Sequence, residues 1–272
     1  MYETVLITTD GSEHAENAAA AGIALARESG SKVHALSVAE TGESRGEAEE
    51  NATLITTRAD RAGCDSEWLV RQGRPANEIL MAARDLDADL IVVGTHGRTG
   101  IQQVLLGSVA LEVVREARCP VLSVSPAVTW RDDEPPIGEV CLATDGWVGT
   151  TDATSHAIEL AGAYDARLHA LYAVDVDSDA PEIRDAFEAA GEQATATVVE
   201  TATDAGIEAT GTVTHGQAHE AILDYVNEEN IDVLVLGTES KSTLQRLVMG
   251  SVAQRVIPNA TVPVITVRTI EE

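Results

Sequence analysis

The chain has 272 residues, of which 44% are hydrophobic and 3% aromatic, and its 18 basic and 45 acidic side chains give a formal charge of −27. This length exceeds what one hydrophobic core usually serves, so we expect two domains. The charge argues against DNA, RNA and anionic membranes as partners, because all three repel a polyanion, and the few aromatic rings offer no platform for stacked bases.

Lysine is rare in the chain: Lys32 and Lys241 are its only examples. A carboxylate-rich surface stays soluble in concentrated salt, where the screening length falls to about 3 Å at about 1 M. We therefore expect a halophilic, cytoplasmic protein, with an ordinary acidic soluble protein as the alternative. The first residues lack a basic signal region, and the longest apolar run, Ala18–Ala26, is shorter than a membrane span. Three well-separated cysteines indicate neither disulfides nor a zinc site.

The sequence contains an internal repeat. Val5–Ser12 returns as Val140–Trp147, 135 positions later, and Cys119–Val124 returns as Val262–Val267, 143 positions later. Two copies of one domain explain both offsets if the second has eight extra residues between its second and third strands. We place the domains at residues 1–128 and 138–272, with a proline- and acid-rich linker around 126–137.

Short apolar strands alternate with Ala-rich stretches of helical length in each copy. Repeated βαβ units predict a parallel sheet with helices on both faces, and right-handed crossovers make it doubly wound. The fold class is therefore α/β: two Rossmann-like, doubly wound, five-stranded parallel-sheet domains in tandem, with strand order 3-2-1-4-5. In copy one the expected elements are strand Val5–Ile7, helix Glu13–Glu28, strand Val33–Val38, strand Leu69–Val70, helix Ala76–Leu86, strand Leu90–Val93, helix Val109–Ala117 and strand Val121–Val124.

The fifth strand of each copy is an edge with unpaired backbone groups. Val121–Val124 and Val264–Val267 have the composition to cover one another within the chain. We therefore expect an intrachain pseudo-dimer of the two domains, with a homodimer as a further option and a protein partner that the sequence does not identify.

A glycine-rich segment follows the fourth strand of copy one. Gly94 and Gly97 are followed, after nine residues, by Gly107-Ser108, where a helix begins. Glycines permit close approach of a phosphate and allow positive φ, while the free N–H groups and positive dipole end of a helix favour an anion. The alternative is that the glycines only end strands and Ser108 only caps the helix.

Asp10 lies after the first strand and makes the ligand interpretation the stronger one. In open parallel sheets, ligands bind at the carboxyl ends of strands, beside the point where the strand order reverses. Asp10 would face the glycine-rich segment there and accept hydrogen bonds from a ribose, and Arg98 adds a positive charge within that segment.

With these residues the sequence resembles the universal stress protein family, over both copies nearly end to end. Nucleotide-binding members carry a Gly-x2-Gly-x9-Gly-Ser/Thr motif, which copy one matches. The resemblance implies ATP as ligand (AMP, ADP or a cyclic nucleotide being alternatives), Mg2+ with the phosphates, and a regulatory role in stress response. It also implies that Asp10 contacts ribose, that the main chain of Val38 contacts adenine, that Thr8, Thr9 and Val93 line the base and sugar, and that Gly94, Gly97, Gly107, Ser108 and Val109 hold phosphates.

Copy two departs from this motif. Ser240 replaces the second glycine and follows Glu239, while Trp147 replaces Ser12. Residues 1–128 hold 11 basic and 19 acidic side chains, a net charge of −8, whereas residues 129–272 hold 7 and 26, a net charge of −19. We therefore expect nucleotide in copy one and weak or no binding in copy two.

Other site classes fit less well. Walker A, G-x-G-x-x-G and G-x-S-x-G segments are lacking, and a phospho-receiver would need an acidic residue and a lysine where Arg71-Gln72 and Ser123–Ser125 stand. His215 and His219 have a spacing that two metal ligands can share, but a turn is expected at Gly216 and a third ligand is not evident, so we expect no metal site.

Two functions remain open at this point. One is a regulatory nucleotide-binding module without catalytic residues; the other is a slow ATP hydrolase or nucleotidyl-transferring relative on the same fold. We favour the module because neither a histidine nor a carboxylate of copy one obviously takes the γ-phosphate position. His96 has the alternatives of donating to a phosphate or facing solvent, and His34 and His169 are expected to be packed rather than catalytic.

Overall fold

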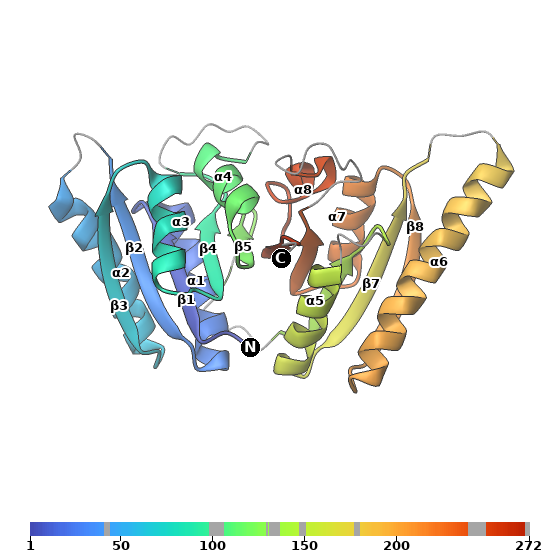
Figure 1. Ribbon diagram of the computed structural model, residues 1–272, viewed down its shortest axis with the longest axis horizontal. Coiled ribbons are helices and arrows are strands. Elements are labelled where there is room, and N and C mark those ends of the chain that lie inside the picture. Colours follow the sequence, from blue (N-terminus) through green and yellow to red (C-terminus); the bar gives the residue numbers. More distant parts are fainter. Residues whose placement is uncertain are drawn as a thin grey trace. The chain divides into compact units, whose positions relative to one another are not determined.

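The computed structural model describes residues 1–40, 44–97, 106–128, 130, 137–146, 151–176, 180–238 and 249–269. The chain forms two compact units, Met1–Glu134 and Pro135–Glu272. Each has five parallel strands with helices on both faces, which confirms the expected α/β tandem fold (Figure 1). Within the described residues, no helix combines the length and apolar character that a membrane span needs.

The N-terminal unit has the strand order β3-β2-β1-β4-β5, as predicted. Its third strand extends beyond the two apolar residues from which it was predicted. As an edge strand it has polar and exposed residues along its length, and these gave no apolar signal. The elements are β1 (Thr4–Thr9), α1 (Glu13–Ser29), β2 (Lys32–Ala39), α2 (Arg45–Arg61), β3 (Ser66–Gln72), α3 (Pro75–Asp85), β4 (Leu90–Gly94), α4 (Ser108–Glu116) and β5 (Val121–Val124).

The C-terminal unit has the equivalent order β8-β7-β6-β9-β10. Its additional residues lengthen one helix: α6 has 24 residues where α2 has 17. The elements are β6 (Glu139–Ala143), α5 (Thr151–Tyr164), β7 (Arg167–Val174), α6 (Pro181–Asp204), β8 (Ala209–His215), α7 (Ala218–Glu228), β9 (Val233–Gly237), α8 (Ser251–Val256) and β10 (Val264–Val267).

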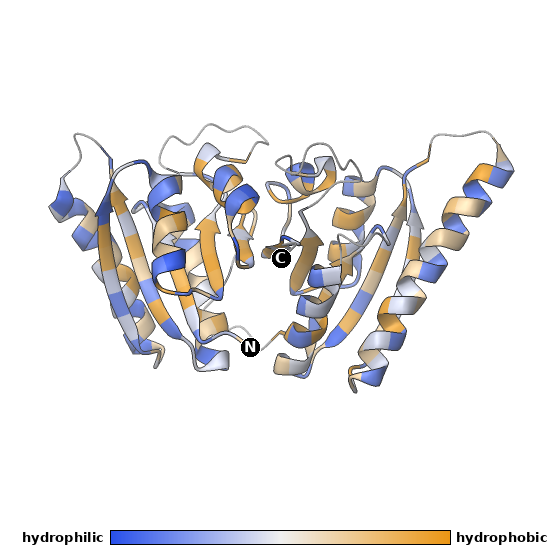
Figure 2. Ribbon diagram, in the orientation of Figure 1, coloured by the Kyte–Doolittle hydropathy of each residue, from blue (hydrophilic) through white to orange (hydrophobic). Residues whose placement is uncertain are grey.

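The core of each unit lies between the central strands and the inner faces of the helices. The central strands are near-continuous apolar runs, orange in Figure 2, while the helices and the edge strands carry both colours. Helix α1 packs very close to the sheet, since a Cβ atom at Gly22 would lie 2.9 Å from Cγ2 of Val92. This close packing holds α1 against the sheet.

The repeat is also visible at the amino-terminal edge of each sheet. Asp89 Oδ2 accepts hydrogen bonds from the backbone N–H groups of Glu3 (2.8 Å) and Thr4 (2.9 Å). Asp232 Oδ2 does the same for Gly138 (2.7 Å) and Glu139 (2.9 Å). An equivalent carboxylate therefore anchors the first strand of each unit.

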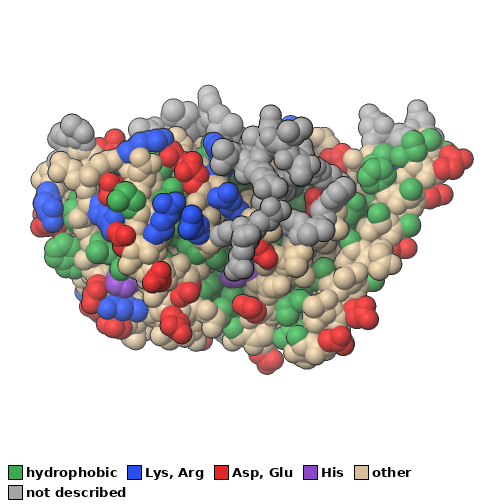
Figure 3. Space-filling model, viewed as in Figure 1, with side chains coloured by type: hydrophobic (Ala, Val, Ile, Leu, Met, Phe, Trp, Pro, Cys, Tyr) green, Lys and Arg blue, Asp and Glu red, His purple; other side chains and the backbone are tan. Residues whose placement is uncertain are grey.

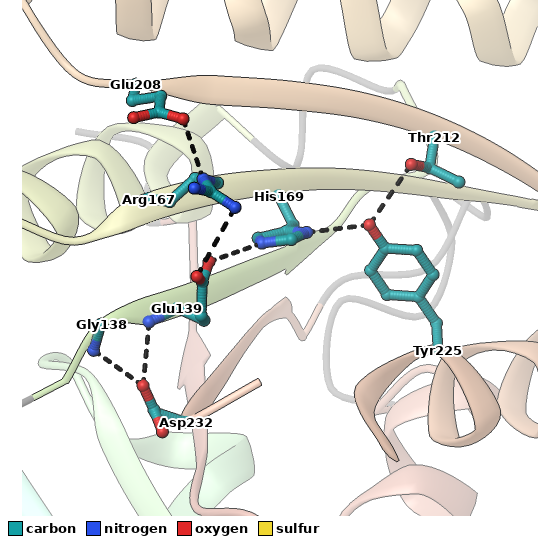
Figure 4. Close-up of polar contacts among 8 residues, drawn as sticks. All are labelled: Gly138, Glu139, Arg167, His169, Glu208, Thr212, Tyr225 and Asp232. Carbon is teal, nitrogen blue, oxygen red and sulfur yellow. Dashed lines mark hydrogen bonds and ion pairs between the residues drawn. The ribbon is translucent and has the colours of Figure 1, made fainter. Parts of the chain in front are cut away.

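His169 lies near this edge in a polar network of the C-terminal unit (Figure 4). It is 4% exposed, and its ring nitrogens hydrogen-bond Glu139 Oε2 (2.8 Å) and Tyr225 Oη (2.9 Å). The equivalent His34 lies 3.9 Å from a Glu67 carboxylate oxygen, and burial lowers its pKa. Both histidines pack within their sheets, at the edge opposite the carboxyl ends of the strands.

Candidate functional site

The topology of the N-terminal unit places a crevice between β1 and β4. These strands are neighbours, with Val5 opposite Leu90 and Ile7 opposite Val92. The chain runs from β1 to β2 in one direction along the sheet and from β4 to β5 in the other. The carboxyl ends of both strands meet where the strand order reverses, which is the usual ligand position in such sheets. Asp10 follows β1 there, and Gly94 ends β4.

Asp10 and Gly97 lie in direct contact across this crevice. Asp10 Oδ1 accepts a hydrogen bond from the N–H of Ser12 at 3.0 Å, which fixes the orientation of the carboxylate. The other oxygen, Oδ2, lies 2.8 Å from the position that a Cβ atom would take at Gly97. A side chain at position 97 would therefore displace the carboxylate, and glycine leaves room for it.

The other glycines of the motif also serve close approach. A Cβ atom at Gly94 would lie 3.2 Å from the carbonyl oxygen of His14, and one at Gly107 would lie 3.0 Å from that of Thr95. Gly94 and Gly97 do not use the positive φ that glycine permits, because the glycines with positive φ lie elsewhere in the described residues. The crowding of the crevice, rather than a left-handed backbone, explains these glycines.

The two ends of the glycine-rich segment are joined by a backbone hydrogen bond. The N–H of Gly107 donates to the carbonyl oxygen of Thr95 at 2.8 Å, so α4 begins directly beside the end of β4. Gly107 is the N-cap of α4 and Ser108 its first residue, one position earlier than expected. Ser108 is thus not the cap residue; its exposed side chain lies in the first turn, among N–H groups that lack intrahelical partners. Val109 follows in that turn, while Arg98 lies outside the described residues.

The threonines and valines expected beside the base and sugar lie on the strands that border this crevice. Thr8 Oγ1 donates to the carbonyl oxygen of Val92 at 2.9 Å, and Thr9 Oγ1 accepts from the N–H of Gly11 at 3.1 Å. Val93 is buried in β4, and Val38 is half-buried near the carboxyl end of β2. The Thr8 hydroxyl therefore connects β1 to β4, and the Thr9 hydroxyl connects β1 to the turn that follows it.

Gly11, Asn51 and His14 near the crevice escaped the sequence reasoning, whereas His96 was considered there. Gly11 has φ of +77°, and a Cβ atom there would lie 2.5 Å from Oδ1 of Asn51 on α2. His96 Nδ1 hydrogen-bonds Thr95 Oγ1 at 2.9 Å, and its ring meets that of His14 edge-on at 6.2 Å. The Asp-Gly pair in both copies was the available signal for Gly11, since Asp-Gly marks turns. The histidine pair had no comparable signal.

The C-terminal unit contains an equivalent crevice. The N–H of Gly146 donates to Thr144 Oγ1 at 3.1 Å, and the N–H of Gly250 donates to the carbonyl oxygen of Thr238 at 3.2 Å, repeating the bonds of copy one. A cavity of about 340 Å³ lies there, lined in part by Asp145 and by Tyr172, which stands where copy one has Ser37. Trp147, Glu239 and Ser240, on which the expected difference between the copies depends, lie outside the described residues.

A turn separates His215 and His219, the two histidines of copy two whose spacing metal ligands can share. His215 ends β8, Gly216 has φ of +128°, and His219 lies in α7. His215 Nε2 lies 3.8 Å from Glu188 Oε1. Groups of three side chains that could hold a metal ion are not found in the described part of the chain.

The charge difference between the copies is visible on the surface. On the face shown in Figure 3, blue and red side chains are mixed over the N-terminal unit, whereas red ones dominate the described part of the C-terminal unit. This follows the net charges of −8 for residues 1–128 and −19 for residues 129–272. A polyphosphate approaching the first crevice meets less repulsion.

Comparisons with known proteins agree with this organisation. A family model described as the universal stress protein family matches residues 1–125 and again residues 137–268. Universal stress protein MJ0531 of Methanocaldococcus jannaschii is 38% identical over 140 residues, covering 46% of this chain and 82% of that protein. The crystal structure of a universal stress protein from Archaeoglobus fulgidus DSM 4304 is similar with a TM-score of 0.75 at 20% identity, covering 97% of this chain and 96% of that one.

A universal stress protein solved in complex with cAMP is 29% identical, covers 45% of this chain and 97% of that one, and has a TM-score of 0.38. The match to MJ0531 spans about half of this chain, whereas the Archaeoglobus fulgidus structure matches nearly all of it.

Proposed function

Because the chain belongs to the universal stress protein family, we propose that its N-terminal unit binds ATP between β1 and β4 and acts as a regulatory module in stress response. The contact between Asp10 and Gly97 carries this proposal. It places a carboxylate suited to ribose hydroxyls beside a backbone without a side chain, as a nucleotide requires. The start of α4 supplies N–H groups for phosphate oxygens at the same edge of the sheet.

In this arrangement each part of the nucleotide has a partner. Asp10 accepts hydrogen bonds from the ribose, while the main chain of Val38 and the side chains of Thr8, Thr9 and Val93 lie beside the base and sugar. Gly94, Gly97, Gly107, Ser108 and Val109 surround the phosphates, with Arg98 adding a positive charge. Mg2+ would accompany the phosphates and keep several waters, as it usually does with nucleotides.

We expect binding rather than rapid turnover. Hydrolysis needs a base that positions water, and neither a histidine nor a carboxylate of copy one obviously takes the γ-phosphate position. Single-turnover assays with Mg-ATP distinguish the two functions. A module gives no product within seconds, whereas product on that time scale would support the slow hydrolase or nucleotidyl transferase.

Native mass spectrometry of the purified full chain tests the ligand itself. The proposal predicts one adenine nucleotide per chain, with ATP retained better than AMP or cAMP added at equal concentration. Two equally occupied sites per chain, or retention of a ligand without a phosphate, would contradict it.

The acidic surface supports a further part of the proposal, a salt-rich cytoplasm. Carboxylates outnumber basic groups 45 to 18, so their mutual repulsion destabilises the fold in dilute buffer and is screened in concentrated salt. Thermal melts should show a rising Tm between about 0.1 M and 2 M KCl. A Tm that falls as salt is added would rule out the halophilic interpretation.

A further inference from the structure

A groove between α1 and α2 of the N-terminal unit shares no lining residue with the nucleotide crevice. It has a volume of about 520 Å³, and its described lining comes from α1, α2 and the residue after α2. Its apolar part includes Ile23 and Ile55, which are 4% and 2% exposed, and Leu54, which is 55% exposed. The groove thus combines an apolar floor with an apolar side chain at its rim that solvent reaches.

Three arginines also line this groove: Arg27 in the last turn of α1, and Arg58 and Arg61 in the last turn of α2. Arg58 Nη1 donates to the carbonyl oxygen of Glu16 at 3.2 Å, which holds its side chain across from α2 to α1. Three of the 11 basic residues of the first 128 therefore gather in one groove of an acidic protein.

The charges near Arg27 and Arg61 leave room for an incoming carboxylate. Arg27 pairs with its neighbour Glu28 at 2.9 Å, but both side chains are well exposed, and such pairs contribute little. Asp60, beside Arg61 in the sequence, accepts a hydrogen bond from Ser66 Oγ at 2.6 Å. Arg61 has neither a hydrogen bond nor an ion pair within the described part of the chain. Among the described residues that line the groove, Glu16 is the one with a carboxylate.

The second copy lacks the arginines at the corresponding positions. A hollow of about 860 Å³ against helices α5 and α6 overlaps these positions only in part, since it extends to Asp145 at the crevice, and no basic residue is among the described residues that line it. Gly162, Thr201 and Asp204 occupy the positions of Arg27, Arg58 and Arg61, and Thr197 that of Leu54. Arginines that only neutralised helix dipoles would be equally useful in both copies. The basic and apolar lining is therefore a specific property of the first copy.

We infer that this groove docks an acidic amphipathic peptide segment of a partner protein. Guanidinium groups pair with carboxylates in a fork geometry, and grooves between helices accept the apolar face of a helical segment. A small anion would leave Leu54 and the apolar floor unused. A nucleic acid would be repelled by a chain of net charge −27. This inference stands independently of nucleotide binding.

Fluorescence anisotropy with the full chain tests the inference. The probe is a fluorescein-labelled synthetic helical peptide with leucines on one face and glutamates on both flanks, and the comparison peptide replaces every glutamate with glutamine. We expect the acidic peptide to bind at least about tenfold more tightly at about 0.1 M salt, with the advantage shrinking toward 1 M as screening increases.

Variants taken from the second copy locate the site. Arg58→Thr with Arg61→Asp should weaken the acidic peptide at least about tenfold, and Leu54→Thr should weaken both peptides. Arg84→Thr with Arg118→Asp changes the net charge equally on other elements, and should leave binding unchanged. If the first pair fails to fold, as judged by thermal melts, Arg61→Asp alone provides the test.

Three results would overturn the inference: unchanged binding in the groove variants, equal weakening in the charge-matched control, or full displacement of the peptide by inorganic pyrophosphate, which would indicate a small-anion site.

Discussion

Replacing Gly97 with alanine tests the geometry of the nucleotide crevice most sharply. The new Cβ atom would lie 2.8 Å from Asp10 Oδ2, whereas an ordinary contact begins at 3.4 Å. The carboxylate or the backbone must therefore move by several tenths of an ångström. Gly97 does not have positive φ, so alanine brings no backbone strain of that kind. The expected result is a folded protein with a displaced ribose acceptor.

The size of the effect follows from the hydrogen bonds at risk. A hydrogen bond to a charged group contributes about 1.5–3 kcal/mol, and each 1.4 kcal/mol corresponds to a factor of ten in affinity. Losing one ribose bond should therefore raise the Kd for ATP by roughly 10- to 150-fold, while stability should change by less than about 1 kcal/mol.

Isothermal titration calorimetry measures the affinity, and urea unfolding measures the stability. Gly46→Ala is the matched control, because its Cβ atom would meet only Ser44 Oγ at 3.5 Å, an ordinary contact. ATP affinity that is equal in both variants would refute the reasoning that Gly97 makes room for the Asp10 carboxylate.

Further predictions concern stability and reactivity. Burial lowers the pKa of His156 from 6.5 to about 4, so the unfolded chain gains a proton first as the pH falls, and stability should drop by up to about 3 kcal/mol between these pH values. Acid melts of His156→Gln should lack this component, and an unchanged pH profile would contradict the assignment. Gly191→Ala should destabilise the protein by about 1–3 kcal/mol, because its Cβ atom would lie 2.7 Å from Cδ1 of Tyr172. Helix propensity alone predicts a gain in stability instead, and such a gain would show that the Tyr172 ring moves aside. Burial raises the pKa of Cys119 to about 11, so its alkylation at pH 8 should be slow in the folded chain and fast in urea, and equal rates would contradict this.

Much of the fold was predictable because it depends on patterns that the chain repeats. The offsets of 135 and 143 positions and the alternation of apolar strands with Ala-rich helices predicted the topology. The less apolar elements were harder. Helix α2 is rich in charged and threonine residues and has a weak apolar face. None of the side chains of the edge strand β3 is fully buried.

The residues of the candidate site were predictable from the sequence, but the contacts that they make were less so. The sequence brought Asp10 together with the glycine motif, and the structure places Asp10 against Gly97. It did not reveal which protein atoms come close to these glycines, because that depends on how the loop packs. Nor did it reveal the arginine groove, since Arg27 and Arg61 become neighbours of one cavity only when α1 and α2 pack side by side.

The central claim is that one ATP binds in the first copy through Asp10. Calorimetric titration of the wild type, Asp10→Asn and Asp145→Asn tests it directly, because the two variants make the same change in equivalent crevices. We predict one site per chain, an affinity lowered at least about tenfold by Asp10→Asn, and no change with Asp145→Asn. Two equal sites in the wild type, or undiminished affinity in Asp10→Asn, would contradict the account.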